Sequence, residues 1–304
     1  MLQRLMLSLS RNQAVARLVG RRGMRAGWVR RFVAGENVQD AVSVVRDLNA
    51  REIQASLDFL GEGVRDAAEA RAASREYIEV LDAIHAAALH SSISVKLTQL
   101  GLDVDAGIAE ENVRQVIARA LRFSNFVRID MESSAYTERT LRMFERLHRE
   151  FGNGVGVVIQ SYLRRSPADV AALLPLKPNV RLCKGAYNEP SDVAFASKSQ
   201  VDRSYMALLE TLLRGAGYTA VATHDERIIR HAIGFAQAAC IPRAAFEFEM
   251  LYGVRRDLQM ELAQQGYSVR VYVPFGRQWY PYFMRRMAER PANLWFVLQN
   301  LVRP

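Results

Sequence analysis

Cysteine is scarce in this chain, and that scarcity limits the kinds of protein it can be. Its 304 residues include only two cysteines, Cys183 and Cys240. Neither stands in a spacing typical of metal ligands, so no bound metal is expected. The sequence therefore excludes a small secreted protein cross-linked by disulfides and predicts a protein of the reducing cytoplasm.

Long apolar runs, internal repeats and low-complexity tracts are also missing. No stretch of about 18 apolar residues is free of charge, so the sequence predicts no membrane-spanning helix. Half of the residues are hydrophobic, which is enough to bury the core of one large domain.

Acidic residues are absent from the first 35 positions, where arginines recur between apolar residues at helical spacing. The net charge of +9 is concentrated there. Residues 1–50 are predicted to form a basic helical extension that lies on an anionic membrane surface. A transit peptide and a solvated basic tail remain open alternatives. Nucleic acid is not an expected partner, since aromatic residues interleave only from Trp28. The expected location is the cytoplasm, in peripheral contact with the inner face of the cytoplasmic membrane. The arginines of the first 35 positions are Arg4, Arg11, Arg17, Arg21, Arg22, Arg25, Arg30 and Arg31.

From residue 51 to residue 304, short β-branched runs alternate with helical patterns, as in βα units. Eight units predict an α/β fold of the (βα)8 TIM barrel type. A doubly wound sheet is the alternative, but it would normally carry a Gly-rich phosphate turn after its first strand, and residues 60–63 are too short for one. The predicted strands are 53–60, 92–97, 126–131, 155–160, 179–184, 219–223, 244–249 and 269–273.

Charged residues occupy the predicted strands, although burying them unpaired would be costly. They are expected to pair with one another inside the barrel. Several polar residues fall near the carboxyl ends of the strands, the face where barrel enzymes place their chemistry. Two of them are lysines, of which the chain has only four. The polar residues near these ends are Lys96, Asp130, Glu132, Gln160, Lys184, His224 and Tyr272.

Six segments in this order resemble the proline dehydrogenase family. The likeness spans about residues 53–301 and implies a distorted barrel whose last helix lies over the barrel mouth. It also implies FAD as cofactor and L-proline as substrate. The segments are 94–97 (SVKL), 128–132 (RIDME), 181–187 (RLCKGAY), 222–224 (ATH), 246–253 (FEFEMLYG) and 272–286 (YVPFGRQWYPYFMRR).

For the cofactor, the resemblance implies that Arg181 lies near the flavin N5, where a permanent cation stabilises the reduced flavin. Lys184, Gly185 and Ala186 would follow the isoalloxazine and ribityl chain. The other flavin contacts implied are Gln160, Thr223 and His224. Thr223 and His224 would also suit a cap for the helix that follows them.

For the substrate, the resemblance implies that Arg285 and Arg286 hold the proline carboxylate together with Lys96. Asp130 would stabilise this arrangement of cations. Hydride would pass from proline C5 to the flavin and leave Δ1-pyrroline-5-carboxylate. The residues expected to wall the pyrrolidine ring are Tyr187, Leu251, Tyr272 and Tyr282.

The resemblance also implies a gate and further partners. Glu62, between Gly61 and Gly63, would pair with Arg285 across the barrel mouth when substrate is bound. A membrane quinone would reoxidise the flavin, and a separate pyrroline-5-carboxylate dehydrogenase would take the product.

Two other classes of function remain open from the residues alone. A Schiff-base lyase would use Lys96 as nucleophile. A basic membrane-surface or nucleic-acid adaptor would bind through the arginine-rich extension and carry no flavin.

Overall fold

The computed structural model describes residues 29–61 and 63–289 and contains a closed barrel of parallel strands. Each strand pairs with its neighbour in sequence, and β1 closes the barrel against β8. This architecture confirms the predicted α/β barrel. The strands are β1 (Gln54–Phe59), β2 (Ser91–Val95), β3 (Val127–Ile129), β4 (Val155–Gln160), β5 (Asn179–Cys183), β6 (Tyr218–Ala222), β7 (Phe246–Leu251) and β8 (Val269–Phe275).

Helices surround the barrel, and some of them begin at a residue whose side chain caps the helix. Asp66 accepts hydrogen bonds from the backbone N–H groups of Ala68 and Glu69, and Asp105 accepts one from Ile108, so two long helices have capped N-termini. The helices are α3 (Val38–Asn49), α4 (Ala67–Ala86), α5 (Ala106–Arg122), α6 (Ser134–Phe151), α7 (Ser166–Leu173), α8 (Lys198–Gly215), α9 (Glu226–Ala238), α10 (Arg256–Gln264) and α11 (Trp279–Glu289).

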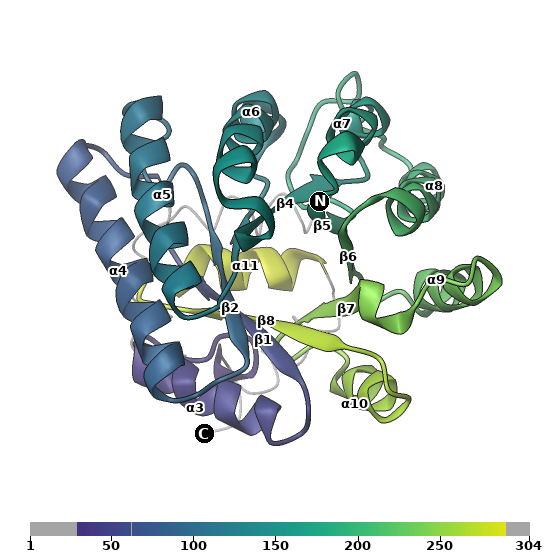
Figure 1. The fold of residues 1–304 in the computed structure, drawn as a ribbon, viewed down its shortest axis with the longest axis horizontal. Coiled ribbons are helices and arrows are strands. Elements are labelled where there is room, and N and C mark those ends of the chain that lie inside the picture. The colour runs from purple at the N-terminus through teal and green to yellow at the C-terminus, as the bar shows by residue number, and fades with distance from the viewer. Residues whose placement is uncertain (1–28, 62, 290–304) are drawn as a thin grey trace.

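The ring of helices is completed by α3, which precedes the first strand. It packs against β1, β8 and α4 and lies between α4 and α10 in the ring (Figure 1). Its buried residues Ala41 and Val45 belong to the same core as the barrel strands. The last helix, α11, leaves the ring and contributes side chains to the cavity at the carboxyl ends of the strands. The described part of the predicted extension is therefore part of the barrel wall.

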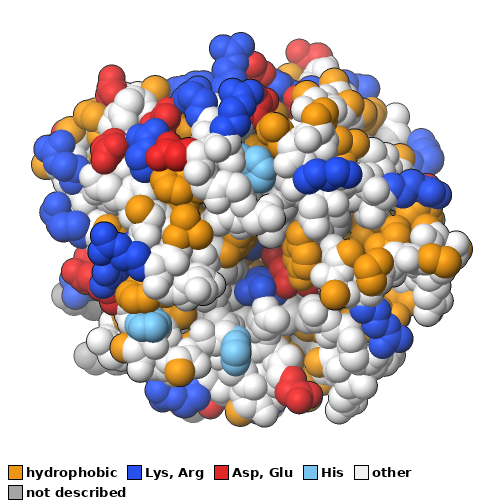
Figure 2. Space-filling view, viewed as in Figure 1, with side chains coloured by type: hydrophobic (Ala, Val, Ile, Leu, Met, Phe, Trp, Pro, Cys, Tyr) orange, Lys and Arg blue, Asp and Glu red, His pale blue; other side chains and the backbone are white. Residues whose placement is uncertain are grey.

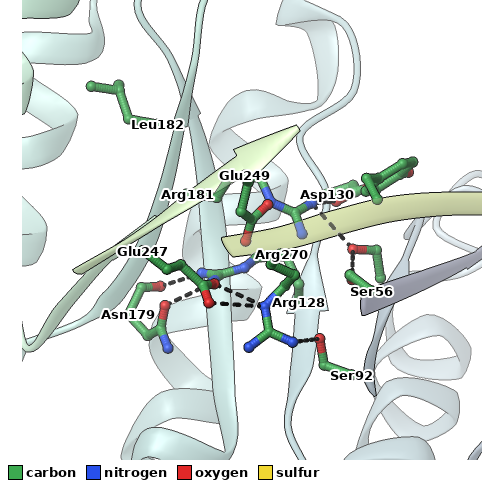
Figure 3. A network of polar contacts seen from close by, with 12 residues as sticks. Ser56, Ser92, Arg128, Asp130, Asn179, Arg181, Leu182, Glu247, Glu249 and Arg270 are labelled. Atoms are coloured by element: carbon green, nitrogen blue, oxygen red, sulfur yellow. Dashed lines mark hydrogen bonds and ion pairs between the residues drawn. The ribbon is translucent and has the colours of Figure 1, made fainter. Parts of the chain in front are cut away.

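The barrel interior is polar and charged, as the sequence predicted. Arg128, Glu247 and Glu249 are at most 3% exposed. Glu247 accepts a hydrogen bond of 2.9 Å from Arg270, and Arg128 donates to the side-chain oxygen of Asn179 at 2.7 Å (Figure 3). In the space-filling view, a small hollow near the centre of the face exposes blue and red side chains (Figure 2). Paired charges thus fill space that apolar side chains fill in many barrels.

Candidate active site

A cavity of about 690 Å³ opens at the carboxyl ends of the strands. Most of the residues predicted from the sequence line it together, although they come from seven strands or strand ends and from α11. Their individual roles stay predictions. The predicted residues that line the cavity are Lys96, Asp130, Glu132, Gln160, Arg181, Lys184, Gly185, Ala186, Tyr187, Thr223, His224, Leu251, Tyr272, Tyr282 and Arg286.

The predicted gate lies outside what the structure describes. Glu62 is not among the described residues, and the same holds for the side chain of Arg285, whose backbone belongs to α11. The pairing of these two residues therefore stays a prediction.

Lys96 is held as a cation at the base of the cavity. Its Nζ lies 2.5 Å from Asp58 Oδ1 and 4.0 Å from Asp130 Oδ2. Burial alone would lower the pKa of Lys96, but the two carboxylates outweigh burial and raise this pKa well above its ordinary value. A lysine kept protonated in this way can bind a carboxylate but is a poor nucleophile, which disfavours the Schiff-base lyase.

Arg181 lies between two carboxylates inside the barrel (Figure 3). Its Nη1 donates to Asp130 Oδ1 at 2.9 Å and to Ser94 Oγ at 3.1 Å, and its Nε forms an ion pair with Glu249. Burial opposes the charge, yet Glu249 and Asp130 outweigh burial and raise the pKa of Arg181. The guanidinium is thus a fixed positive charge beneath the cavity.

Asp130 connects the two cations to the aromatic wall. It accepts a hydrogen bond from Arg181 and a second one, of 2.7 Å, from the hydroxyl of Tyr272. The Tyr272 ring also lies 5.2 Å from the guanidinium carbon of Arg181. Asp130 therefore orients Arg181 and Tyr272 with one carboxylate, and this agrees with a supporting role rather than that of a proton acceptor.

Lys184 and Gly185 follow β5 and line the side of the cavity where a flavin is expected. Lys184 Nζ is held by Asp202 at 2.6 Å and by Asp225 at 3.1 Å. Gly185 has φ +111°, and a Cβ there would lie 2.3 Å from the ring of Tyr162. Only glycine suits this turn, because the position combines left-handed backbone with close packing.

Two polar atoms at the cavity leave hydrogen-bonding capacity for a bound group. Gln160 Oε1 and Arg181 Nη2 are buried and have no partner among the described residues. Both side chains line the cavity. Because buried polar atoms are almost always hydrogen-bonded, this donor and this acceptor suit a polar ring system such as the isoalloxazine of FAD.

The sequence matches the family described as proline dehydrogenase over residues 41–299. The chain belongs to the proline dehydrogenase family. It is 44% identical to a proline dehydrogenase of Deinococcus radiodurans over 277 residues, 90% of this chain and 89% of the relative. It is 41% identical to proline dehydrogenase 1 of Bacillus subtilis over 303 residues, 100% of both chains. These similarities support proline oxidation as the activity of this chain.

Solved structures agree with this assignment to the proline dehydrogenase family. The fold is similar to that of proline utilization A from Bdellovibrio bacteriovorus, with a TM-score of 0.81 and 27% identity. The match covers 86% of this chain and 32% of that protein, so this chain spans about a third of the length of the solved structure.

Asp58 and Glu249 are site residues to which the sequence assigned no role. They fall on the predicted strands 53–60 and 244–249, and each neutralises a cation of this proline dehydrogenase family site. Their inward period-2 position was the available signal. Which cation each one meets depends on contacts between strands: β1 with the end of β2 for Asp58, and β7 with β5 for Glu249.

Two features, a membrane-spanning helix and a metal site, are absent from the described residues. Within residues 29–61 and 63–289, no helix combines the length and apolar character needed to cross a bilayer. In the same ranges, no group of three or more His, Cys, Asp or Glu side chains could hold a metal ion.

Proposed function

We propose that this chain oxidises L-proline to Δ1-pyrroline-5-carboxylate with FAD as the hydride acceptor. The observation that carries the proposal is the pair of fixed cations, Lys96 and Arg181, joined by Asp130 at the base of an aromatic-walled cavity. Lys96 suits the carboxylate of a substrate, and Arg181 suits a group that gains negative charge during the reaction.

In this proposal Lys96 binds the proline carboxylate as a point charge. Arg286 lines the same cavity from α11 and offers a planar fork to that carboxylate, and Arg285 is assigned the same role from the family resemblance. Tyr187, Leu251 and Tyr282 would bury the methylenes of the pyrrolidine ring and exclude water.

FAD would be held by Gln160, by residues 184–186 and by residues 223–224, all at this cavity. When bound, FAD supplies the two-electron acceptor that no side chain provides. The part left to the protein is to orient proline, to bind it with its amine deprotonated and to keep Arg181 charged beneath the flavin.

Electron transfer beyond the flavin is assigned to a membrane quinone, and the product to a separate pyrroline-5-carboxylate dehydrogenase. The arginine-rich residues 1–28, which lie outside the described residues, would dock the chain on the inner face of the cytoplasmic membrane. Each arginine near an anionic surface contributes about 1 kcal/mol, so removing this segment should weaken binding to anionic vesicles, most at low salt. Equal vesicle binding with and without the segment would overturn this assignment.

An anaerobic visible spectrum tests the proposed reaction. The purified protein should show flavin bands that L-proline bleaches and a quinone analogue restores. A colourless protein that borohydride inactivates only in the presence of substrate would instead support the lyase. A colourless protein that binds a membrane surface or nucleic acid and does not oxidise proline would support the adaptor.

Replacing Tyr272 by serine should narrow the preference for proline over trans-4-hydroxyproline. The ring is expected to lie near proline C4, so its loss removes wall area while the serine hydroxyl offers a polar partner. The measurement is kcat/KM for both substrates. Tyr272→Phe is the matched control, because it keeps the ring and loses only the hydroxyl that donates to Asp130. An equal loss for both substrates in Tyr272→Ser would contradict this placement.

A further inference from the structure

The chain just before α3 runs as a strap across the end of β8. We define the N-terminal strap as residues 29–36. Ala34 N donates to Pro274 O at 2.9 Å, and Gly276 N donates to Gly35 O at 2.9 Å. These two backbone hydrogen bonds fix the strap to the segment that leads from β8 into α11.

The strap also packs directly on α11. The rings of Phe32 and Phe283 have centroids 6.3 Å apart, and Phe283 lies in edge contact with Trp279 at 6.0 Å. The indole Nε1 of Trp279 donates to Glu36 Oε1 at 3.2 Å. All three rings are at most 2% exposed. The strap thus supplies an apolar and a polar contact to the first turns of this helix.

The contacts with the strap and with the cavity lie on adjacent stripes of α11. Trp279 and Phe283 are four residues apart, and so are Tyr282 and Arg286, so each pair forms one stripe. The first pair faces the strap, and the second lines the cavity. Because a helix moves as a rigid unit over two turns, a shift of the first stripe displaces the second.

The strap also packs against Gly253, two residues after β7. Gly253 has φ +77°, and a Cβ at this position would lie 1.8 Å from the carbonyl oxygen of Arg31. Such a contact is impossible, and a backbone carbonyl cannot rotate away as a side chain can. The strap therefore packs closely against Gly253 as well as against α11.

We propose that the N-terminal strap is a positioning element of the substrate site: Phe32 and Glu36 set the placement of α11 and, through it, of Tyr282 and Arg286 at the cavity. This inference rests on the proposed function, because it assigns the strap to proline binding. No residue of the strap touches substrate in this proposal. The strap acts only through the helix.

Two independent changes should displace the strap and give one phenotype. Phe32→Ala removes its ring contact with α11, and Gly253→Ala pushes the Arg31 carbonyl away. Both should raise the proline KM about 10- to 100-fold while lowering kcat less, since a displacement of about 1 Å in a positioning group can cost that much. FAD content should stay near that of the wild type, because the expected flavin contacts lie on other elements.

Gly266→Ala is the matched control for backbone strain. Gly266 has φ +78°, against +77° at Gly253, but a Cβ there would meet only the guanidinium end of Arg243 at 3.2 Å. Both alanine variants should lower Tm, whereas only Gly253→Ala should change KM. Phe32→Leu covers the case in which Phe32→Ala does not fold, and it should raise KM less because part of the apolar contact remains.

The experiment measures kcat and KM for proline with a quinone analogue as electron acceptor, anaerobic bleaching of the flavin by proline, and Tm for these variants. In a double-mutant cycle, Phe32→Leu and Gly253→Ala should be less than additive in KM, because both displace the same segment. A wild-type flavin that proline does not bleach would overturn the proposed function. A bleachable wild type, with KM unchanged in the folded Phe32 and Gly253 variants or raised equally in Gly266→Ala, would overturn the role of the strap alone.

Discussion

Replacing Arg181 by alanine is expected to slow flavin reduction by proline about 10²- to 10³-fold, with a much smaller change in proline binding. The guanidinium is a fixed charge beneath the cavity, and a charge aimed at developing negative charge matters most in the transition state. Rapid-mixing kinetics would separate the limiting rate of reduction from half-saturation by proline. An equal loss in binding alone would contradict this role.

The stability of the Arg181 variant needs a control of its own, because its loss leaves Asp130 and Glu249 without their shared cation. Removing one partner of a buried ion pair costs about 3–5 kcal/mol. Arg181→Ala combined with Glu249→Gln removes one of the two stranded charges and should regain part of the lost Tm. Because Glu249 does not replace the missing cation, the slow reduction should persist in this double variant.

Replacing Lys96 by methionine should reduce both stability and substrate affinity. Its partner Asp58 is 1% exposed, so the variant buries an uncompensated carboxylate, at about 3–5 kcal/mol of unfolding free energy. The loss of a charged hydrogen bond to the proline carboxylate should raise KM about 10- to 100-fold. Urea unfolding and steady-state kinetics measure the two effects.

Combining Lys96→Met with Asp58→Asn separates structure from binding. Replacing both members of a buried pair with neutral groups of similar size can be nearly neutral, so stability should return to within about 1–2 kcal/mol of the wild type. The raised KM should remain, because no cation has been restored. Recovery of KM along with stability would show that Lys96 supports the fold and does not bind the substrate.

The sequence predicted the fold well because the barrel strands carry strong local signals. The β4 segment is a run of β-branched residues that helical neighbours bound on both sides, and its predicted limits coincide with Val155–Gln160. Helix α3 was different. Its own residues indicate an amphipathic helix but not which surface it covers, so its place beside β1 and β8 could not be read from local pattern.

In the site, too, local sequence predicts where a residue lies but not which residue it contacts. The position of Arg181 at a strand end was readable, but its pairing with Glu249 depends on the distance between β5 and β7, two strands that are not neighbours in the barrel. The strap was missed for a related reason. Phe32 and Phe283 are separate apolar residues in the sequence, and only the closed barrel brings their rings together.

The contact between the strap and α11 also constrains the order of events while the chain is synthesised. Glu36 and Trp279 are 243 residues apart in the sequence. At about 5–20 residues per second, the ribosome needs roughly 12 to 50 s to deliver the second residue after the first. Until then Phe32 lacks its aromatic partner on α11, and β1 lacks β8. Barrel closure and the placement of α11 are therefore late steps, and the nascent chain must keep an open sheet edge from pairing wrongly in the meantime.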